Sequence, residues 1–431
     1  MKVGIISLGC SKNLVDSEMV LGVIKKMNLE IVNDVEDADI IIINTCGFIE
    51  SAKQEAINTI LEMADYKKMG KKLCVIGCLV QRYLEELPSL LPEVDLFIPI
   101  KDYFRFGELF SKLVDHTFAS SLHFEDRVLT TPSYMAYVRI ADGCDNRCHY
   151  CAIPLIRGGF HSRSISDIVS EVKLLTDKGV REINLISQDT TRYGTDINTS
   201  IVELLKELVK NKDIKMLRLL YLYPEEITRE LIQTIKENEV ICNYFDVPIQ
   251  HASNEVLANM NRRDTKENMR ELFTYIKKEI PDAILRTTVI VGYPGETRKQ
   301  FLELRDFIKE IKFDRLGCFM YSKEEDTVAY SLPNQVTKKA KENRYNEIMA
   351  LQSDISYNQG LGHVGEIHKV IIEELDFETN LYVGRSYAFA PDDIDGYIFV
   401  DSKEDLELGS IVSCKIDKAD IYNLYGHVVS A

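Results

Sequence analysis

The stretch Ile140-Ala-Asp-Gly-Cys144-Asp-Asn-Arg-Cys148-His-Tyr-Cys151-Ala-Ile-Pro154 is the most informative part of this sequence. Its three cysteines are spaced four and then three residues apart, and they follow an apolar run typical of a strand. Three thiols on one short loop can converge on a single soft metal centre. A cluster of four irons takes four ligands, so three cysteines leave one iron open to bind a further group, as in catalytic metal sites. The loop therefore predicts a catalytic iron–sulfur centre.

The spacing CxxxCxxC, with Tyr150 directly before the last cysteine, resembles the signature of the radical S-adenosylmethionine enzymes. In that family the open iron chelates the amino and carboxylate groups of S-adenosylmethionine and passes it an electron, which cleaves it to a 5'-deoxyadenosyl radical. The resemblance implies a [4Fe–4S] cluster on Cys144, Cys148 and Cys151. A zinc knuckle or three buried thiols are the alternatives, and both are disfavoured because no fourth Cys or His stands nearby at zinc-finger spacing.

Size and composition are those of an ordinary globular protein. The chain has 431 residues, of which 45% are hydrophobic and 28% charged, enough for two or three domains. No stretch approaches the length of a membrane span, and the N-terminus lacks a signal-peptide pattern, so we expect a cytoplasmic protein with no membrane partner. In that reducing compartment the ten cysteines indicate metal ligation or catalysis before disulfides.

The charge balance argues against naked nucleic acid as the main partner. The net charge is −16, from 52 Lys and Arg against 68 Asp and Glu. Binding to nucleic acid requires a basic surface that neutralises phosphates, so only a local basic patch could serve that purpose here.

Residues 1–115 alternate between strand and helix patterns and are expected to form an N-terminal domain with a parallel α/β layer. The expected strands are 2–8, 39–44 and 72–76, and the expected helices are 11–27 and 49–69. Cys10, Cys46 and Cys78 each lie just past the carboxyl end of one strand, beside a glycine. Because such ends share one edge of a sheet, the three thiols should meet in space. The alternative, cysteines that only pack, is disfavoured because all three positions are equivalent.

The motifs Ser7-Leu-Gly-Cys10, Asn44-Thr-Cys46 and Gly77-Cys78, followed by CxxxCxxC, resemble those of the methylthiotransferases, and the resemblance covers essentially the whole chain. It implies that Cys10, Cys46 and Cys78 hold a second [4Fe–4S] cluster with one open iron, which carries or donates sulfur. The predicted cofactors are thus two [4Fe–4S] clusters and S-adenosylmethionine, with all six cysteines as metal ligands and catalytic residues. A reductant such as flavodoxin or ferredoxin is expected as a partner.

Residues 116–133 are polar and end in Thr130-Thr-Pro132, so they are predicted to be a linker. The following domain, residues 134–335, repeats strand and helix six times, which predicts a partial (β/α)6 radical S-adenosylmethionine barrel. Its expected strands are 134–140, 182–186, 216–223, 244–249, 283–291 and 314–321. The active site of such a barrel lies at the carboxyl ends of the strands, and the cysteine loop follows the first of them.

Four residues in or near the cysteine loop are candidates for binding S-adenosylmethionine. Tyr150 and Ile153 are expected to pack on its adenine. Arg157 and Arg163 are expected to meet its methionine carboxylate, because arginine matches a carboxylate in bidentate fashion. The alternative for both arginines is a salt bridge between strands.

Residues at later strand ends complete the predicted pocket. Gln188 and Asp189 end the second strand, where related enzymes bind the amino group of S-adenosylmethionine, and Gln250 ends the fourth. The fifth strand continues into a turn that contains Gly292 and Gly295, whose missing side chains would let backbone approach the nucleoside. An ordinary turn before a helix is the alternative for these glycines.

Residues 336–362 have the pattern of a charged amphipathic connector helix, and residues 363–431 alternate in the manner of short strands. Strands expected at 368–372, 382–388, 397–400, 411–416 and 424–429 make a small five-stranded, OB-like β-barrel. This domain resembles the TRAM domain, an RNA-binding type in many relatives. The predicted fold class is therefore α/β, with an N-terminal parallel α/β domain, a partial barrel and a C-terminal β-barrel.

The methylthiotransferases divide between a modified adenosine of tRNA and an aspartate of a ribosomal protein as substrate. From Glu366 to Ala431 there are fourteen Asp and Glu against five Lys and Arg, a surface that repels a polyanion and attracts a basic protein. The run Leu219-Leu-Tyr-Leu-Tyr-Pro224 also resembles the ribosomal-protein branch. We therefore expect methylthiolation of the β-carbon of an aspartate of small-subunit ribosomal protein twelve. The alternatives are a tRNA isopentenyl-adenosine methylthiotransferase and a non-catalytic RNA-binding iron–sulfur protein.

Overall fold

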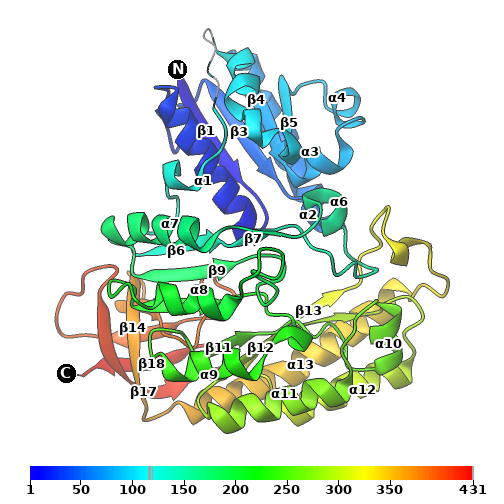
Figure 1. The fold of residues 1–431 in the computed structure, drawn as a ribbon, viewed down its shortest axis with the longest axis vertical. Helices are drawn as coiled ribbons and strands as arrows, with labels where there is room; N and C mark the ends of the chain where they lie inside the picture. Colours follow the sequence, from blue (N-terminus) through cyan, green and yellow to red (C-terminus); the bar gives the residue numbers. More distant parts are fainter. Residues whose placement is uncertain (115–117, 119, 430–431) are drawn as a thin grey trace.

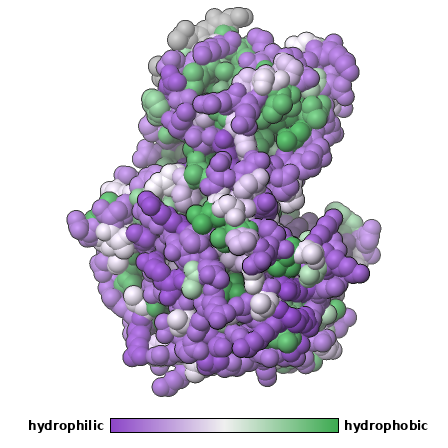
Figure 2. Space-filling model, turned by 90° about the vertical axis from the view of Figure 1, so that its right-hand side faces the viewer, coloured by the Kyte–Doolittle hydropathy of each residue, from purple (hydrophilic) through white to green (hydrophobic). Residues whose placement is uncertain are grey.

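The computed structural model describes residues 1–114, 118 and 120–429. An N-terminal unit lies at the top, the partial barrel lies below it, and the C-terminal β-barrel lies beside the partial barrel at lower left (Figure 1). Hydrophilic side chains cover most of the surface, and the outline is indented where the N-terminal unit meets the part below (Figure 2). Within the described residues, no helix has the length and apolar character that crossing a membrane requires.

The N-terminal unit is a five-stranded parallel sheet in the order β2-β1-β3-β4-β5, which confirms the predicted parallel α/β layer. Its strands are β1 (Lys2–Ser7), β2 (Glu30–Ile31), β3 (Ile40–Thr45), β4 (Lys72–Gly77) and β5 (Leu96–Pro99). Its helices are α1 (Ser11–Lys26), α2 (Glu50–Ala64), α3 (Cys78–Tyr83), α4 (Leu87–Leu90) and α5 (Phe106–Phe110). The central strand β3 is buried along its whole length, as expected for a parallel strand with helices on both faces.

The central unit contains the six predicted parallel strands, in two three-stranded sheets of order β10-β9-β6 and β11-β12-β13. They are β6 (Met135–Arg139), β9 (Glu182–Ile186), β10 (Met216–Leu219), β11 (Tyr244–Asp246), β12 (Ile284–Val291) and β13 (Arg315–Met320). A single parallel bridge between Leu217 and Ile241 joins the two sheets, so the six strands form one open arc. A short antiparallel pair, β7 (Ala141–Asp142) and β8 (His161–Ser162), flanks the cysteine loop.

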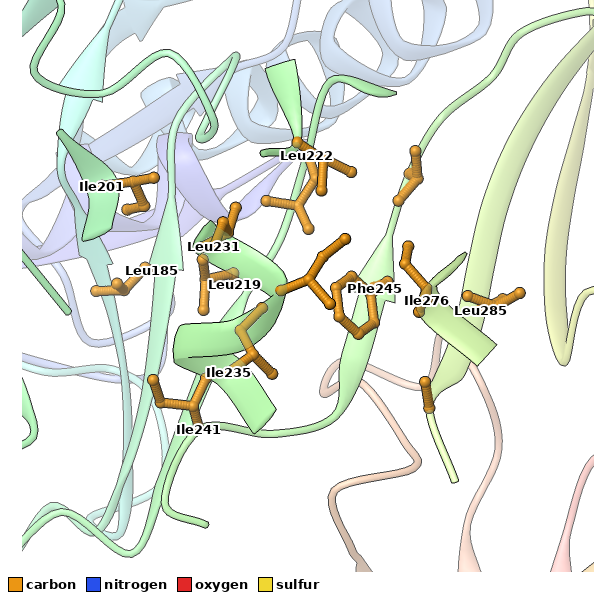
Figure 3. Packing of buried hydrophobic residues seen from close by; sticks show 14 of the residues in the cluster. Leu185, Ile201, Leu219, Leu222, Leu231, Ile235, Ile241, Phe245, Ile276 and Leu285 are labelled. Carbon is orange, nitrogen blue, oxygen red and sulfur yellow. The ribbon is translucent and has the colours of Figure 1, made fainter. Parts of the chain in front are cut away.

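Helices cover the outer face of this arc. They are α7 (Ile165–Asp177), α8 (Ile201–Leu208), α9 (Arg229–Glu237), α10 (Asn254–Asn259), α11 (Lys266–Glu279) and α12 (Arg298–Ile311). The short helix α6 (Ile153–Arg157) instead follows the cysteine loop and packs against α3 of the N-terminal unit. Figure 3 shows how strand residues Leu219 and Phe245 pack with helix residues such as Leu231, Ile235 and Ile276. This largest core fixes the strand ends, on which the chemistry depends.

The C-terminal unit is a closed barrel of order β14-β15-β16-β18-β17, which confirms the predicted five-stranded β-barrel. The long helix α13 (Lys338–Gly362) precedes it, and its strands are β14 (Ile367–Asp376), β15 (Leu381–Arg385), β16 (Ile398–Asp401), β17 (Ile411–Ala419) and β18 (Leu424–Val428). Arg385 pairs with Glu182 of β9 at 2.8 Å, and Arg218 of β10 donates to the carbonyl oxygens of Ser386 and Tyr387. The C-terminal barrel thus packs against strands of the partial barrel.

The region predicted to be a linker, 116–133, begins among residues outside the described part of the chain. Its later residues pack firmly between the N-terminal unit and the partial barrel. Arg127 is only 3% exposed and lies 3.5 Å from Glu18 of α1 and 3.3 Å from Glu171 of α7. This buried charge cluster ties α1 to the partial barrel.

Candidate active site with two cysteine centres

The three N-terminal cysteines lie at one edge of the parallel sheet. Cys10 is the residue before α1, Cys46 follows β3, and Cys78 is the first residue of α3, directly after β4. Strands β1, β3 and β4 are neighbours in the sheet, so their carboxyl ends lie side by side. The topology therefore brings together three thiols that are far apart in the sequence.

The surroundings of Cys78 suit a buried side chain that binds a metal. Its thiol donates to Asn13 Oδ1 at 3.3 Å, and the guanidinium of Arg157 lies 3.7 Å from its sulfur. Burial raises the pKa of Cys78 to about 12, Arg157 lowers it, and the neighbouring Cys10 and Cys46 raise it further. The high pKa means that a free thiolate is costly in this buried position. A bound metal replaces the thiol proton and neutralises the thiolate, so the sulfur can serve as a ligand there.

Glycine beside the thiols makes room for them. A Cβ on Gly9 would lie 2.8 Å from Cβ and 3.2 Å from Sγ of Cys46, and Gly9 also has φ of +89°. Gly77, before Cys78, has φ of +98°, and a Cβ there would lie 2.7 Å from the carbonyl oxygen of Thr45. Side chains at either position would push the cysteine loops apart.

The CxxxCxxC loop is held by its own backbone. Cys144 N–H donates to the Gly158 carbonyl at 3.1 Å, and Cys151 N–H donates to the Cys148 carbonyl at 3.0 Å. Gly143 has φ of +74°, and a Cβ there would lie 2.0 Å from the carbonyl oxygen of Gly159. Since no side chain fits at that position, the close approach of these backbone segments fixes the start of the loop.

Burial also raises the pKa of two thiols in this loop. It raises the pKa of Cys144 to about 11. It raises the pKa of Cys151 still further, and the neighbouring Cys148 and Cys144 add to that rise. Like Cys78, these thiols are poor anions until a metal takes the place of the proton.

Both trios suit a cluster better than a single ion. A Zn–S bond is about 2.3 Å, so two thiolates on one zinc lie at most about 4.6 Å apart. Within the described part of the chain, the three potential ligands that lie within 4.8 Å of one another are His363, Glu366 and His368, and neither cysteine trio meets that limit. Three soft thiolates that do not already converge on a single-ion site suit a [4Fe–4S] cluster better than a zinc knuckle.

The two centres are neighbours in space. Cys78, Ala152 and Ile156 form one small buried cluster, in which α3 packs against the start of the helix that follows the CxxxCxxC loop (Figure 1). From that helix, Arg157 reaches Asp16 of α1 at 2.7 Å and Asp142 at 3.4 Å. A buried network of opposite charges thus joins the N-terminal thiols to the partial barrel.

Both arginines predicted to meet a ligand carboxylate already have carboxylate partners. Arg157 pairs with Asp16, and Arg163 lies 2.5 Å from Glu171 and donates to the carbonyl of Arg139 at 2.7 Å. Their role toward S-adenosylmethionine stays a prediction.

The other predicted pocket residues surround the cysteine loop. Gln188 donates to Asp142 at 3.0 Å, and Asp189 accepts from Asn146 of the loop at 2.7 Å. Tyr150 packs against a buried cluster that includes Tyr293. Ile153 begins α6, and the backbone of Gln250 has φ of +67° and pairs with β12.

The predicted glycine turn follows β12. Gly292 N–H donates to the side chain of Glu296, and a Cβ on Gly292 would lie 2.3 Å from the side chain of Lys341 of α13. A Cβ on Gly295 would meet no atom within 4 Å. The turn is therefore tightly packed at Gly292 and open at Gly295.

Arg262 is a site residue that the sequence did not indicate. Only 7% exposed, it lies 3.7 Å from the centre of the Tyr223 ring and donates to the carbonyl of Pro248 at 2.9 Å. Tyr223 in turn lies 3.8 Å from the sulfur of Cys148. Arg262 sits in a loop without a motif, so no spacing signal pointed to it.

His251, next to Gln250, gives a prediction about pH. Its Nδ1 accepts from Ser253 N–H at 2.9 Å, and complete burial, helped by the charge of Arg344, lowers its pKa to about 3. Well above pH 6.5 the ring is neutral in both the folded and the unfolded chain. As the pH falls below 6.5, the unfolded chain binds a proton that the folded chain excludes, so stability falls by about 2 kcal/mol at pH 5.

Thermal unfolding at pH 7.5 and pH 5 checks this expectation. The His251→Asn variant should lose less stability on acidification than the wild type. The exposed His123, whose ring pairs with the hydroxyl of Ser121, provides the matched control, and His123→Asn should behave as the wild type. Equal losses in the wild type and His251→Asn would contradict the assignment of a neutral, buried His251.

Three family models match this chain. The model described as "Uncharacterized protein family UPF0004" matches residues 2–99, that of the radical SAM superfamily matches residues 138–308, and that of the TRAM domain matches residues 364–429. These ranges coincide with the sheet of the N-terminal unit, most of the partial barrel, and the closed barrel.

Full-length relatives share close to half of the sequence. The chain is 50% identical over 435 residues to the ribosomal protein uS12 methylthiotransferase RimO of Alkaliphilus oremlandii, and the alignment covers 99% of both chains. It is 46% identical over 441 residues to the protein of the same name from Clostridioides difficile, with 100% of this chain and 99% of the relative covered.

Solved structures of lower identity share the fold. The radical S-adenosylmethionine methyltransferase TsrM from Kitasatospora setae has a TM-score of 0.55 at 14% identity, with 74% of each chain covered. The cobalamin-dependent S-adenosylmethionine radical enzyme OxsB has a TM-score of 0.52 at 12% identity, with 82% of this chain and 56% of that chain covered. At such identities the likeness concerns the fold alone.

Proposed function

This chain belongs to the family of the ribosomal protein uS12 methylthiotransferases named RimO, which are radical S-adenosylmethionine enzymes, and from that membership we propose its reaction. The enzyme replaces one hydrogen on the β-carbon of an aspartate of uS12, small-subunit ribosomal protein twelve, with a methylthio group. The hydrogen leaves on 5'-deoxyadenosine from one S-adenosylmethionine, and a second S-adenosylmethionine supplies the methyl group. A one-electron donor of the flavodoxin or ferredoxin class supplies the electrons.

The single observation that carries this proposal is the pairing of two three-cysteine centres within one buried network. Cys144, Cys148 and Cys151 would hold one [4Fe–4S] cluster, and Cys10, Cys46 and Cys78 would hold the other. When bound, the two clusters and S-adenosylmethionine supply the electron, the hydrogen-abstracting radical and the sulfur. Three ligands in each trio leave a fourth position for S-adenosylmethionine at one centre and for sulfur at the other.

The residues between the centres orient and shield them. Arg157 links Asp16 of the N-terminal unit to Asp142 beside the cysteine loop, and it also lies 3.7 Å from the sulfur of Cys78. A cation at that distance stabilises negative charge on the ligand sulfur. The buried packing of Cys78 against Ala152 and Ile156 shields that side of the Cys78 thiol from water.

The charge of the C-terminal barrel supports a basic protein as substrate. The acidic side chains that are exposed on it are Glu366, Glu374, Glu378, Asp392, Asp393, Asp401, Glu404, Asp405, Glu407 and Asp417. A surface of this charge attracts basic proteins and repels tRNA, and ribosomal proteins are basic because they bind rRNA.

The test is a mass measurement on two substrates. Anaerobically reconstituted enzyme, S-adenosylmethionine and reductant are incubated with uS12 and, separately, with isopentenylated tRNA. We expect a mass gain of one methylthio group on the aspartate of uS12 and none on tRNA. A gain on tRNA alone would contradict the proposal.

Salt provides a second measurement in the same assay. The KM for uS12 should rise with ionic strength, because the attraction between opposite charges is screened. Replacing Glu404, Asp405 and Glu407 by the corresponding amides should also raise KM and flatten its salt dependence. The matched control removes three exposed acidic charges from the N-terminal unit, at Asp34, Glu36 and Asp37, and should leave KM unchanged.

A further inference from the structure

One cation beside the N-terminal cysteines lacks a carboxylate partner. Lys12 is the second residue of α1, two positions after Cys10, and it is 7% exposed. Its ammonium lies 3.4 Å from the centre of the Tyr221 ring and 3.5 Å from the carbonyl oxygen of Ser187. Over residues 1–114, 118 and 120–429, no carboxylate oxygen of Asp or Glu comes within 4.0 Å of this ammonium.

The other buried cations around Lys12 are neutralised. Arg157 pairs with Asp16 at 2.7 Å, and Arg139 pairs with the same carboxylate at 2.6 Å. Arg286 pairs with Asp246 at 2.6 Å. Burying an ammonium without a counter-ion is costly, and the face of an aromatic ring offsets only part of that cost. A bound anion would therefore stabilise the buried ammonium of Lys12.

Lys12 lies at the carboxyl ends of the barrel strands, where substrates bind. Ser187 follows β9, and Tyr221 follows β10. The backbone of Tyr221 has φ of +62°, a conformation uncommon for an aromatic residue, and it is held there by a hydrogen bond from its N–H to Asp246 at 2.8 Å. This hydrogen bond thus holds the backbone from which the Tyr221 ring meets the Lys12 ammonium.

This position is between the two cysteine centres. On one side, Lys12 is two residues from Cys10 in the first turn of α1. On the other side, its carbonyl partner Ser187 leads into Asp189, which accepts from Asn146 of the CxxxCxxC loop at 2.7 Å. The ammonium is thus connected to the N-terminal centre through α1 and to the CxxxCxxC loop through the residues that follow β9.

We propose that Lys12 binds the side-chain carboxylate of the aspartate that the enzyme modifies; this assignment rests on the proposed function. The β-carbon of aspartate is bonded directly to that carboxylate, so a cation that holds the carboxylate fixes the reacting carbon one bond away. An ammonium has three N–H donors, and the Ser187 carbonyl takes at most one of them. Lys12 is then a determinant of specificity for aspartate.

A second unpaired cation accounts for the other carboxylate that the reaction brings. S-Adenosylmethionine carries a methionine carboxylate. Arg262, which also lacks a carboxylate within 4.0 Å among the residues described, lies beside Tyr223 and hence near Cys148 of the barrel centre. Arg262 thus offers the methionine carboxylate a cation on the side of the CxxxCxxC loop, while Lys12 offers one to the substrate on the side of the N-terminal cysteines.

The test measures binding without turnover. Cluster-loaded enzyme, with S-adenosylmethionine present and reductant omitted, is titrated against fluorescent uS12 peptides that carry Asp, Asn or Glu at the target position. Wild-type enzyme should bind the Asp peptide at least about 30-fold more tightly than the Asn peptide, because an unpaired buried charge remains in the second complex. Since this comparison needs no variant, it does not depend on how a variant folds.

Variants then assign the effect to Lys12. Lys12→Met keeps the aliphatic stem and loses the charge, so it should bind the Asp and Asn peptides equally. Lys12→Arg should restore part of the preference for Asp. Lys25→Met removes an exposed lysine from the last turn of the same helix and should retain the wild-type preference. Iron content and circular dichroism of each variant establish that it is loaded and folded.

Three results would overturn the proposal. Equal binding of the Asp and Asn peptides by the wild type would do so, and so would an unchanged preference in folded Lys12→Met. A loss of S-adenosylmethionine affinity in Lys12→Met as large as the loss of peptide affinity would assign the cation to the methionine carboxylate instead. If the wild type neither binds nor modifies uS12, the proposed function itself fails; if it modifies uS12 and Lys12→Met still prefers Asp, only the role of Lys12 fails.

Discussion

Replacing Cys144, Cys148 and Cys151 together by alanine is expected to lower the iron content of the anaerobically reconstituted protein from about eight to about four atoms per chain. Cleavage of S-adenosylmethionine should fall below detection. The three thiols are the only cysteines on their loop, and backbone hydrogen bonds from Cys144 and Cys151 hold that loop in place without the sulfur atoms. The variant should therefore fold and keep the N-terminal centre.

Iron analysis and the formation of 5'-deoxyadenosine measure the two effects. The matched control replaces three buried cysteines that lie away from both centres, Cys242, Cys318 and Cys414. That variant should keep about eight irons and its cleavage activity. A wild type that binds only about four irons, or a Cys144/Cys148/Cys151 variant that binds none, would contradict the existence of two separate centres.

The fold was largely predictable because its long elements carry strong periodic patterns. Strands such as β3 and β12 and helices such as α1 are long enough for apolar spacing to mark them. The elements that the sequence did not indicate are short. Strand β2 has two residues and β5 has four, and such lengths contain too few alternations to form a pattern.

The grouping of the six cysteines into two sets was predictable for two different reasons. Those of the CxxxCxxC loop are close in sequence, so their spacing alone indicates a common centre. Those of the N-terminal unit are far apart, and the argument from strand ends was needed to bring them together. The structure places Cys10, Cys46 and Cys78 at the ends of three adjacent strands, as that argument requires.

The charged residues of the site were harder to predict, because their partners come from distant parts of the chain. Arg157 is 141 positions from Asp16 in the sequence, and no local pattern indicates that the two are 2.7 Å apart. Lysine is usually exposed, and nothing in the sequence pattern of α1 marks Lys12 as buried. Its burial against Tyr221 results from the packing of the N-terminal unit on the barrel, which spacing along the chain cannot reveal.

The second large effect is expected from replacing Cys10, Cys46 and Cys78 together by alanine. About four irons should remain, on the CxxxCxxC loop, and cleavage of S-adenosylmethionine should stay within a few-fold of the wild-type rate. Transfer of the methylthio group to uS12 should be abolished. The physical reason is that the two sets of thiols lie on separate units of the fold, each with its own backbone support.

The products of one reaction mixture measure both activities, because 5'-deoxyadenosine reports cleavage and the mass of uS12 reports transfer. Complete loss of cleavage in a folded variant would contradict this division of labour between the centres. The single variant Cys10→Ala separates loss of the centre from loss of folding. Cys10 is exposed at the start of α1, so its replacement removes no buried contact, whereas Cys78 is buried against Ile156. If all three thiols are needed to hold the sulfur-carrying centre, this mildest substitution should lose transfer as completely as the triple variant while cleavage continues.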